Sequence, residues 1–333
     1  MDRILVNAVS AKNGGARTIV ESFAAAASNY PELNFVILAG FEKPETLTQN
    51  VTWRVLPMSG AVAMAFTVFG VALFHLWYRT RILISFNNIN CVLVPANRRI
   101  TYFHQLKALD PSLLEPKIRV IRTYLHHTRE TIVVQSLQVQ GAFEAMFGRN
   151  KHEIIVAWPG IKIAETASFT AGERMTVLVP VAAPESPHKN FAFALDVARH
   201  LAPGWRMVVT APEISDKTEL KGSNIEFVGV LSRENLFKWY RRATVVLMPS
   251  THETIGLPIF EALVVGTPVV AYDADYIRAL NAHFSVGDCL SIIATPQAAV
   301  DAIEASREKR PGAALKRKLQ RSEWHKVFQK AKR

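Results

Sequence analysis

Two glutamates eight positions apart flank a predicted helix start in residues 250–261, which read STHETIGLPIFE. Pro258 suits the first turn of a helix, because the N–H that proline lacks would have no partner there. Glu253 is therefore expected in the loop after a buried strand, and Glu261 about one turn inside the helix. Carboxylates at this spacing can hold hydroxyl groups at two parts of one extended ligand. Acids at a helix start also stabilise the helix dipole, which is the alternative interpretation.

The start of the same helix offers a second kind of interaction. Free N–H groups near Gly256 and Leu257 form a site for an anion such as phosphate. Two acids that bind hydroxyl groups, placed around an anion site, describe a nucleotide sugar. The segment therefore predicts a nucleotide-sugar site.

Strands and helices must position this segment. The sequence contains short apolar runs typical of strands, which alternate with segments of helical periodicity. One alternating series runs from residue 4 to 135, and a second runs from 175 to 271, after the punctuating Pro159-Gly160. Such alternation is typical of βαβ units and a parallel sheet. We expect an α/β protein whose two Rossmann-like domains face each other across a ligand-binding cleft. The expected strands are 4–9, 35–38, 82–85, 100–103, 131–135, 175–181, 206–210, 225–228, 243–248 and 268–271, and the expected helices are 18–28, 190–200, 233–241 and 258–265.

Composition restricts the class of protein. The chain has 333 residues, of which 49% are hydrophobic, and a formal net charge of +11. A disordered chain would be poorer in apolar residues, and a disulfide-stapled secreted scaffold would have more than two cysteines. Residues 1–10 read as a core strand rather than a signal peptide, because their apolar run is short. We therefore expect a cytoplasmic protein.

The positive charge is concentrated in two segments. Residues 307–333 contain eleven basic and two acidic side chains, and residues 98–129 contain seven basic and two acidic ones. Apolar residues recur at helical spacing through the tail, between the lysines and arginines. We expect 311–333 to form a basic amphipathic helix that contacts an anionic membrane surface. A solvated helical tail is the alternative, and nucleic-acid binding lacks any recognition motif.

A long uncharged stretch separates Arg54 from Arg79. Its length could span a bilayer, which needs about 20 apolar residues. A single span, however, would put the flanking strands of one domain on opposite sides of the membrane. We expect a helix near 58–78 that packs on the first domain with one side and contacts the membrane with the other, with His75, Trp77 and Tyr78 near the headgroups. An ordinary core helix and a true span are the alternatives. Together with the basic tail, this stretch predicts one membrane face.

Residues 250–269 resemble the signature of retaining nucleotide-sugar glycosyltransferases of the GT-B type, glycosyltransferase family 4. That pattern is Ser-x-x-Glu-x-Phe-Gly-Leu-Pro-x-x-Glu-Ala, ending in Gly-x-Pro-Val, and Ile255 replaces the usual Phe. The matching positions are Ser250, Glu253, Gly256, Leu257, Pro258, Glu261, Ala262, Gly266, Pro268 and Val269. The resemblance extends over nearly the whole chain. It implies a GT-B fold with a first, acceptor domain in 1–160, a second, donor domain in 161–310, and a last helix in 311–333 that crosses back to the first domain.

The resemblance also implies roles for single residues. Glu253 would contact the transferred sugar and Glu261 the ribose, while Ile255, Gly256 and Leu257 would belong to the donor site. Lys189 resembles the family lysine that neutralises the donor diphosphate, and a fixed charge there stabilises a leaving group when no metal does so.

One departure concerns the diphosphate. The family usually has an arginine a few residues before the lysine, and residues 179–188 contain none. Either another basic residue takes its place or the diphosphate is held less strongly.

The first domain supplies three further candidates. Gly14 and Gly15 follow the first strand, where glycines let a backbone approach a phosphate or sugar, although a plain turn would look the same. His104 follows strand 100–103 and resembles the family's active-site histidine, and the alternative is a strand-end histidine that binds only backbone. His126 and His127 lack a second cluster with ligand spacing, so no metal site is expected.

The resemblance implies a metal-independent retaining transferase without a cofactor. By the resemblance, it would move a sugar from a UDP-sugar or GDP-sugar to an acceptor hydroxyl. The apolar and basic segments favour a lipid-linked acceptor, as in bacterial lipopolysaccharide, capsule or exopolysaccharide assembly, on the inner face of the cytoplasmic membrane. The alternatives are a catalytically weakened, membrane-associated partner of another transferase and a nucleotide-sugar epimerase of the same fold.

Overall fold

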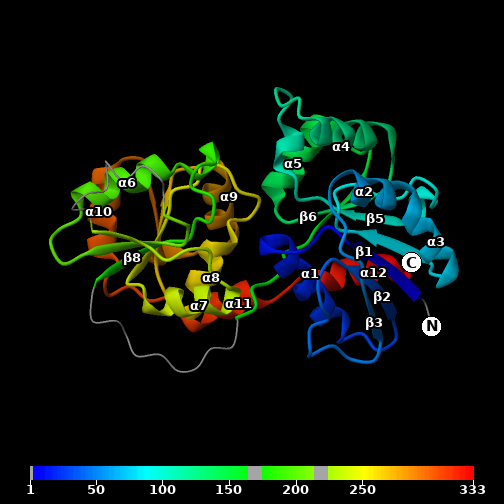
Figure 1. Ribbon diagram of the computed structural model, residues 1–333, viewed down its shortest axis with the longest axis horizontal. Helices are drawn as coiled ribbons and strands as arrows, with labels where there is room; N and C mark the ends of the chain where they lie inside the picture. The colour runs from blue at the N-terminus through cyan, green and yellow to red at the C-terminus, as the bar shows by residue number, and fades with distance from the viewer. Residues whose placement is uncertain (1–2, 164–174, 214–223) are drawn as a thin grey trace. The chain divides into compact units, whose positions relative to one another are not determined.

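The computed structural model describes residues 3–163, 175–213 and 224–333, and the chain divides into two compact units (Figure 1). Unit 1 comprises Met1–Gly160 and Ser322–Arg333, and unit 2 comprises Ile161–Arg321. Each unit is built on one parallel sheet. The predicted α/β class with two Rossmann-like domains is confirmed, and the end of the chain returns to the first unit as expected.

Unit 1 contains a seven-stranded sheet in the order β3-β2-β1-β4-β5-β6-β7. Its strands are β1 (Arg3–Ala8), β2 (Asn34–Ala39), β3 (Val51–Val55), β4 (Ile82–Ser85), β5 (Arg99–Tyr102), β6 (Thr131–Val134) and β7 (Glu153–Val156). Val6 pairs with Ile37 on one side and with Ile84 on the other. The strand order reverses between β1 and β4, so the loops after these two strands diverge and form a topological switch point.

Helices cover both faces of this sheet. They are α1 (Gly14–Ala27), α2 (Gly60–Ala65), α3 (Val71–Trp77), α4 (Pro116–His127), α5 (Leu137–Phe147) and α12 (Trp324–Lys332), with the short turns η1 (Phe66–Gly70), η2 (Ala96–Arg98) and η3 (Leu106–Leu109). Neighbouring residues of a strand face opposite sides of a sheet. Phe35 packs against Phe23 of α1 and Phe328 of α12, whereas Val36 belongs to the cluster with Ala63 of α2 and Val71 of α3.

Unit 2 repeats the strand order of unit 1 in a six-stranded sheet, β10-β9-β8-β11-β12-β13. Its strands are β8 (Thr176–Val179), β9 (Arg206–Val209), β10 (Ile225–Phe227), β11 (Val245–Met248), β12 (Val269–Tyr272) and β13 (Leu290–Ile293). Its helices are α6 (Phe191–His200), α7 (Arg233–Arg242), α8 (Leu257–Val265), α9 (Asp275–Phe284), α10 (Pro296–Ala305) and α11 (Ala313–Gln320), with the turns η4 (Pro187–Lys189) and η6 (Gly287–Cys289). The switch point of unit 2 lies between β8 and β11.

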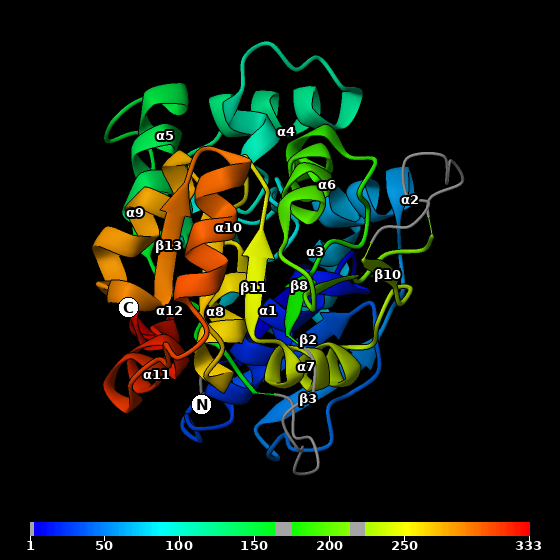
Figure 2. The same cartoon turned by 90° about the vertical axis from the view of Figure 1, so that its left-hand side faces the viewer.

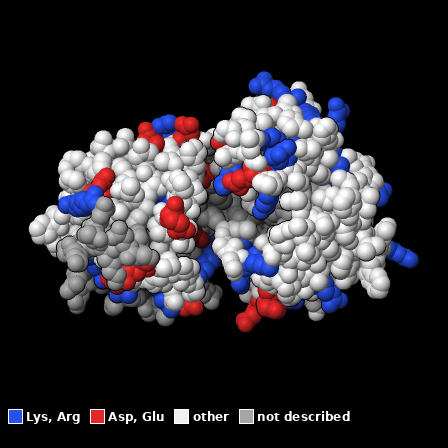
Figure 3. Space-filling view, turned by 45° about the horizontal axis from the view of Figure 1, so that its top comes forward, with Lys and Arg blue, Asp and Glu red and all other residues white. Residues whose placement is uncertain are grey.

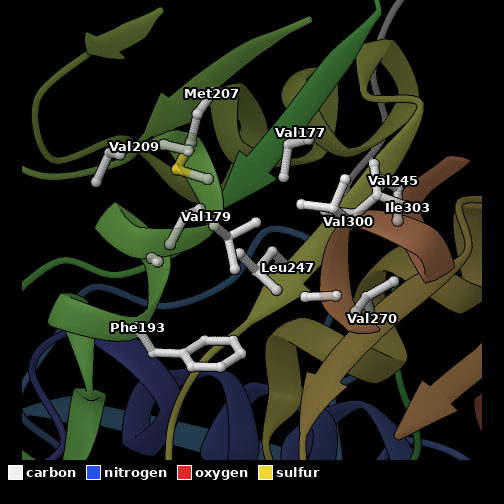
Figure 4. Close-up of a cluster of buried hydrophobic side chains, with 14 of the residues drawn as sticks. Val177, Val179, Phe193, Met207, Val209, Val245, Leu247, Val270, Val300 and Ile303 are labelled. Atoms are coloured by element: carbon white, nitrogen blue, oxygen red, sulfur yellow. The ribbon is translucent and has the colours of Figure 1, made fainter. Parts of the chain in front are cut away.

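The core of unit 2 explains why its strands are short apolar runs. A strand covered on both faces needs apolar side chains at every position. Val177, Val179 and Leu247 point toward α6 and α10, which lie side by side over one face of the sheet (Figures 2 and 4). Their neighbours Leu178 and Val246 are equally buried on the opposite face.

The tail forms two helices, and the expected single helix over 311–333 is wrong. α11 belongs to unit 2 and α12 to unit 1. Between the two helices, the N–H of Glu323 donates to Trp158 O at 2.8 Å instead of to a carbonyl of the preceding helix. Trp158 N in turn donates to the Glu323 carboxylate at 3.0 Å. The tail is therefore fixed to unit 1 at this point, and α12 begins again at Trp324.

The expected helix near 58–78 is present as the continuous run α2-η1-α3, from Gly60 to Trp77. By length and composition it is the one helix among the described residues that could cross a membrane, and 22% of this window is buried. That low burial disagrees with the core-helix alternative. The run and α12 cover opposite faces of the sheet of unit 1. The prediction of one membrane face is therefore wrong for α12, and for α11, which belongs to unit 2, it stays a prediction.

Candidate active site

The two charged residues predicted to bind the donor diphosphate and sugar form an ion pair in unit 2. Lys189 ends the turn η4 after β8, and Glu253 lies in the loop after β11. Because β8 and β11 are adjacent at the switch point, the two loops meet there. Lys189 Nζ lies 2.6 Å from Glu253 Oε1, and the two side chains are 23% and 20% exposed. The pair is partly open to solvent, so a ligand can reach both charges.

Main-chain contacts hold these two loops together. Thr251 N donates to His188 O at 2.9 Å, and Asn190 Nδ2 donates to Pro249 O at 3.2 Å. Asn190 adopts a left-handed conformation with φ of 49°, which asparagine tolerates better than most residues. The residues on both sides of Lys189 are thus bound to the loop that leads to Glu253.

The predicted helix start after Glu253 is present as the beginning of α8. Gly256 precedes the helix with φ of +58°, and a Cβ there would lie 3.0 Å from Ile259 and from Tyr276. Both the conformation and the space require glycine. Ile255 is buried, and Leu257 is the first residue of the helix. The role of these three residues in anion binding stays a prediction.

Glu261, the predicted ribose ligand, is buried within α8 and paired inside the unit. Arg233 Nη2 donates to Glu261 Oε1 at 3.2 Å, and the Tyr240 hydroxyl donates to Oε2 at 3.2 Å. Burial raises the pKa of Glu261, and the positive charge of Arg233 opposes this rise. An ionised carboxylate has about four acceptor positions. The two oxygens therefore retain capacity for ribose hydroxyl groups while α7 fixes their orientation.

Sequence reasoning missed Arg233 and Tyr240. Arg233 also donates from the same Nη2 to Lys162 O at 2.6 Å, so two acceptors hold this end of the guanidinium. The signal that could have found it is its place as the first residue of α7, directly after the N-cap Ser232. Among the described residues, Glu253 pairs with Lys189 and Arg233 pairs with Glu261.

Unit 1 holds the other candidates, around its own switch point. Gly14 starts α1 after β1 and has φ of +61°, a conformation that favours glycine, and Gly15 follows it. His104 follows β5, where its N–H donates to Asn88 Oδ1 at 2.7 Å and its Nε2 lies 3.3 Å from Asn88 Nδ2. Burial lowers the pKa of His104 to about 4, so the imidazole is neutral at pH 7.

A hydrogen-bond network at this switch point was also missed. The side-chain amides of Asn7 and Asn87 both donate to Thr67 Oγ, at 3.1 and 3.0 Å. Thr67 lies in η1, a π-helical turn in the apolar helix, and such turns are frequent at functional sites. The widened turn lets a residue of the apolar helix reach the ends of β1 and β4.

The structure thus gathers the candidates in two separate groups. Gly14, Gly15 and His104 belong to unit 1, and Lys189, Glu253 and Glu261 belong to unit 2. Among the described residues, no group of three or more His, Cys, Asp or Glu side chains could hold a metal ion. The assignments of individual site residues stay predictions.

Residues 176–307 match the family described as Glycosyl transferases group 1. A D-inositol 3-phosphate glycosyltransferase from Jonesia denitrificans is 39% identical over 64 residues, which cover 19% of this chain and only 15% of that protein. Sucrose-phosphate synthase from Thermosynechococcus elongatus has a similar structure, with a TM-score of 0.67, 14% identity, and coverage of 100% of this chain and 98% of that one. Alr3699/HepE from Anabaena, in complex with UDP-glucose, gives a TM-score of 0.63 at 14% identity, over 99% of this chain and 100% of that one. Unit 2 therefore contains a glycosyl transferases group 1 domain, and the chain as a whole has the GT-B fold.

Proposed function

We propose that this protein is a glycosyltransferase that moves a sugar from a nucleoside diphosphate sugar to an acceptor hydroxyl. The observation that carries the proposal is the Lys189–Glu253 pair at the switch point of unit 2, within the group 1 domain. A UDP-sugar is the favoured donor, since the Anabaena protein of the same fold is in complex with UDP-glucose. A GDP-sugar is the second choice.

The pair suggests how donor binding would proceed. Without donor, Glu253 neutralises Lys189 at 2.6 Å. A diphosphate carries more negative charge than a carboxylate, so it would displace Glu253 from Lys189. A Glu253 oxygen could then accept a hydrogen bond from a hydroxyl group of the sugar. Lys189 would then stabilise the charge that develops on the leaving diphosphate.

The proposed reaction follows the family 4 pattern of retention without a metal. The acceptor oxygen forms a bond to the anomeric carbon on the face from which the diphosphate departs, and the bond from that carbon to the phosphate oxygen breaks. The departing phosphate takes the acceptor proton, so charge and atoms balance. Glu253 would orient the sugar, and Glu261, held by Arg233 and Tyr240, would orient the ribose.

We further propose a lipid-linked saccharide as acceptor, of the kind used in lipopolysaccharide, capsule or exopolysaccharide assembly. The support is the exposed apolar helix of unit 1, which would bring a peripheral enzyme to the inner face of the cytoplasmic membrane. The neutral groups at the switch point of unit 1, including His104 and the amides of Asn7 and Asn87, suit an uncharged sugar hydroxyl.

The test uses purified protein, a panel of labelled UDP- and GDP-sugars, and lipid extracts as acceptors. Transfer to lipid with retained configuration, unaffected by a metal chelator, is the expected result. Glu253→Gln should abolish it, whereas Glu308→Gln, an exposed acid beyond α10, should not. Equal activity of Glu253→Gln and the unchanged protein would refute the proposed site. Activity of another transferase that rises when this inactive chain is added would indicate the weakened-partner alternative instead.

A further inference from the structure

The outer side of α2-η1-α3 is an apolar stripe. Val62, Phe69, Leu73, Leu76 and Trp77 are between 56% and 83% exposed. On the inner side every fourth residue is buried, and these residues, at most 8% exposed, are Ala63, Thr67, Val71 and His75. The helix is therefore packed on the sheet by one side only. Contiguous exposed apolar surface of this length marks an interaction site rather than ordinary surface.

The neighbouring loop widens the stripe at its centre. Val92 N donates to Val68 O at 3.1 Å, so residues 91–94 lie beside the π-helical turn. Val92 and Leu93 are 44% and 64% exposed. The space-filling view of unit 1 has a broad area without charged side chains, bordered by Lys and Arg (Figure 3). The apolar stripe, defined as the outer residues of α2-η1-α3 with Val92 and Leu93, is thus a surface and not a single ridge.

Three arginines gather where the stripe ends. Arg3 Nη1 donates to Tyr78 O at 3.3 Å, and Arg54 Nε donates to the Tyr78 hydroxyl at 3.2 Å. Arg79 follows Tyr78 in the chain and is exposed. The two hydrogen bonds go to neutral oxygens, and no ion pair among the described residues involves any of the three. We call Arg3, Arg54 and Arg79 the arginine rim.

The sequence around Arg54 and Arg79 contains no acidic residue. No Asp or Glu occurs between Glu45 and Asp110. The tail is different, because Lys330 pairs with Glu153 at 2.5 Å and Lys332 pairs with Glu32 at 2.6 Å. The side chains available to an anionic surface beside the stripe are therefore those of the arginine rim, and not the lysines of α12.

The strands before and after the helix show whether it can span a membrane or must lie on one. β3 precedes the helix and β4 follows it, and both belong to the same parallel sheet. A single crossing would separate them, so the helix must stay on one side of the bilayer. An amphipathic helix that lies in the interface requires an apolar face, basic neighbours and aromatic residues at headgroup level.

We propose that the apolar stripe lies in the interface of an anionic bilayer and that the arginine rim binds lipid phosphates there. Guanidinium groups bind phosphate oxygens in pairs, and Trp77 with Tyr78 supplies the aromatic residues at the same level. The apolar stripe supplies the binding energy, and the arginine rim selects anionic headgroups. Membrane docking does not depend on sugar transfer by the chain. An experiment can therefore refute the docking proposal without refuting the transferase proposal, and the reverse.

The test is co-sedimentation of the full chain with vesicles of phosphatidylcholine alone or mixed with phosphatidylglycerol. Binding to the mixed vesicles is expected to exceed binding to the neutral ones and to fall with salt. Trp77→Gln with Leu73→Gln should lower the partition at least about tenfold on both vesicles. Leu137→Gln, which replaces an equally exposed leucine on α5, is the matched control and should change nothing.

A second pair of variants isolates the arginine rim. Arg54→Gln with Arg79→Gln should lower partition on anionic vesicles roughly 25-fold, since each arginine contributes roughly fivefold, and should leave partition on neutral vesicles unaffected. Arg119→Gln with Arg122→Gln removes the same charge from α4 and is the control. Circular dichroism verifies that each variant is folded.

Several outcomes would overturn the proposal. These are no binding to either vesicle, an equal loss in the α4 control, or competition by inorganic phosphate as strong as that by anionic lipid. A dimer of the unchanged protein that Leu73→Gln dissociates would show instead that a second copy covers the apolar stripe.

Discussion

Unit 1 and unit 2 have the same strand order around their switch points but opposite chemistry there. In unit 2 the loops bring charges together, as Lys189 with Glu253 and Arg233 with Glu261. In unit 1 the corresponding loops bring together side-chain amides, Thr67 and a neutral His104. The fold alone therefore fixes where a ligand can bind, whereas the side chains after β1, β4, β8 and β11 decide whether it is charged. A charged donor for unit 2 and an uncharged acceptor for unit 1 fit this difference.

The outer surfaces differ as well. Unit 1 exposes the apolar stripe, but its other sheet face is closed by α12, whose Trp324 is 1% exposed. That indole packs edge-on against Phe23 and donates from Nε1 to Ser22 Oγ at 3.1 Å. Two tryptophans of one unit thus have opposite environments, since Trp77 is 83% exposed.

The largest expected effect is on stability, from replacing the buried one of these two tryptophans. Trp324→Ala should destabilise unit 1 by about 3–5 kcal/mol, because it leaves a cavity in an aromatic cluster. Trp77→Ala should change the free energy of unfolding by less than about 0.5 kcal/mol, because it removes no buried contact. Denaturant unfolding followed by circular dichroism measures both. Comparable losses for the two variants would contradict the assignment of the α2-η1-α3 outer side as exposed.

The next effect concerns unit 2. Lys189→Met should lower kcat for sugar transfer by about 10²–10³, since a preorganised charge that stabilises the leaving group is lost. Lys189→Arg should retain part of the activity. Steady-state kinetics with the donor identified by the panel measure this, with the vesicle partition as internal control. A Lys189 variant that loses membrane binding together with activity would contradict the assignment of membrane binding to unit 1 and of donor chemistry to unit 2.

A smaller effect is expected at the nucleoside end of unit 2. Arg233→Gln should raise KM for the donor about tenfold with little change in kcat, because Arg233 orients Glu261 without touching the reacting atoms. Tyr240→Phe removes the other hydrogen bond to the same carboxylate and should cost about 1 kcal/mol of stability. A fall in kcat at unchanged KM for Arg233→Gln would place that arginine at the phosphates instead.

Sequence reasoning succeeded where one short segment contained both the fold signal and the chemistry. The 250–269 segment placed Glu253 in a loop and Glu261 in a helix, as observed, because Pro258 and the glycines mark the helix start. β3, β7 and β13 were missed, since Val51–Val55 alternates exposed and buried positions and β7 at the sheet edge is only partly buried. β3 and β13 lack the continuous apolar run that was used to find the others, because Thr52, Arg54 and Ser291 interrupt them. Residues 154–158 do form such a run, so β7 could have been found from the sequence.

Contacts between distant segments could not be predicted. The pairing of Glu261 with Arg233 joins residues 28 positions apart, and the break between α11 and α12 depends on Trp158, 165 positions from Glu323. The tail has a regular helical pattern of apolar residues, but a local pattern does not show that two parts of it pack on different units. The exposure of the apolar helix depended in the same way on tertiary packing.

The dependence of stability on pH also distinguishes the units. The pKa of His104 is lowered from 6.5 to about 4 by burial, so between pH 6.5 and 4 the unfolded chain binds a proton that the folded chain does not. Stability from this group is present above pH 6.5 and is lost as pH falls through that window, by roughly 1–3 kcal/mol. The pKa of Glu261 is raised above its usual 4.5, so its contribution has the opposite sign and is lost as pH rises above 4.5.

Urea unfolding of His104→Gln and Glu261→Gln across this range tests the contrast, with each variant compared with the unchanged protein at the same pH. The stability of the unchanged protein relative to His104→Gln should fall from pH 6.5 to 4, whereas its stability relative to Glu261→Gln should rise as pH falls toward 4.5. The two slopes have opposite signs because His104 is a partly buried base that desolvation keeps neutral, whereas Glu261 is a buried acid whose protonated form desolvation favours. Slopes of the same sign would mean that Arg233 outweighs burial at Glu261, and that the buried carboxylate of unit 2 stays ionised throughout the range.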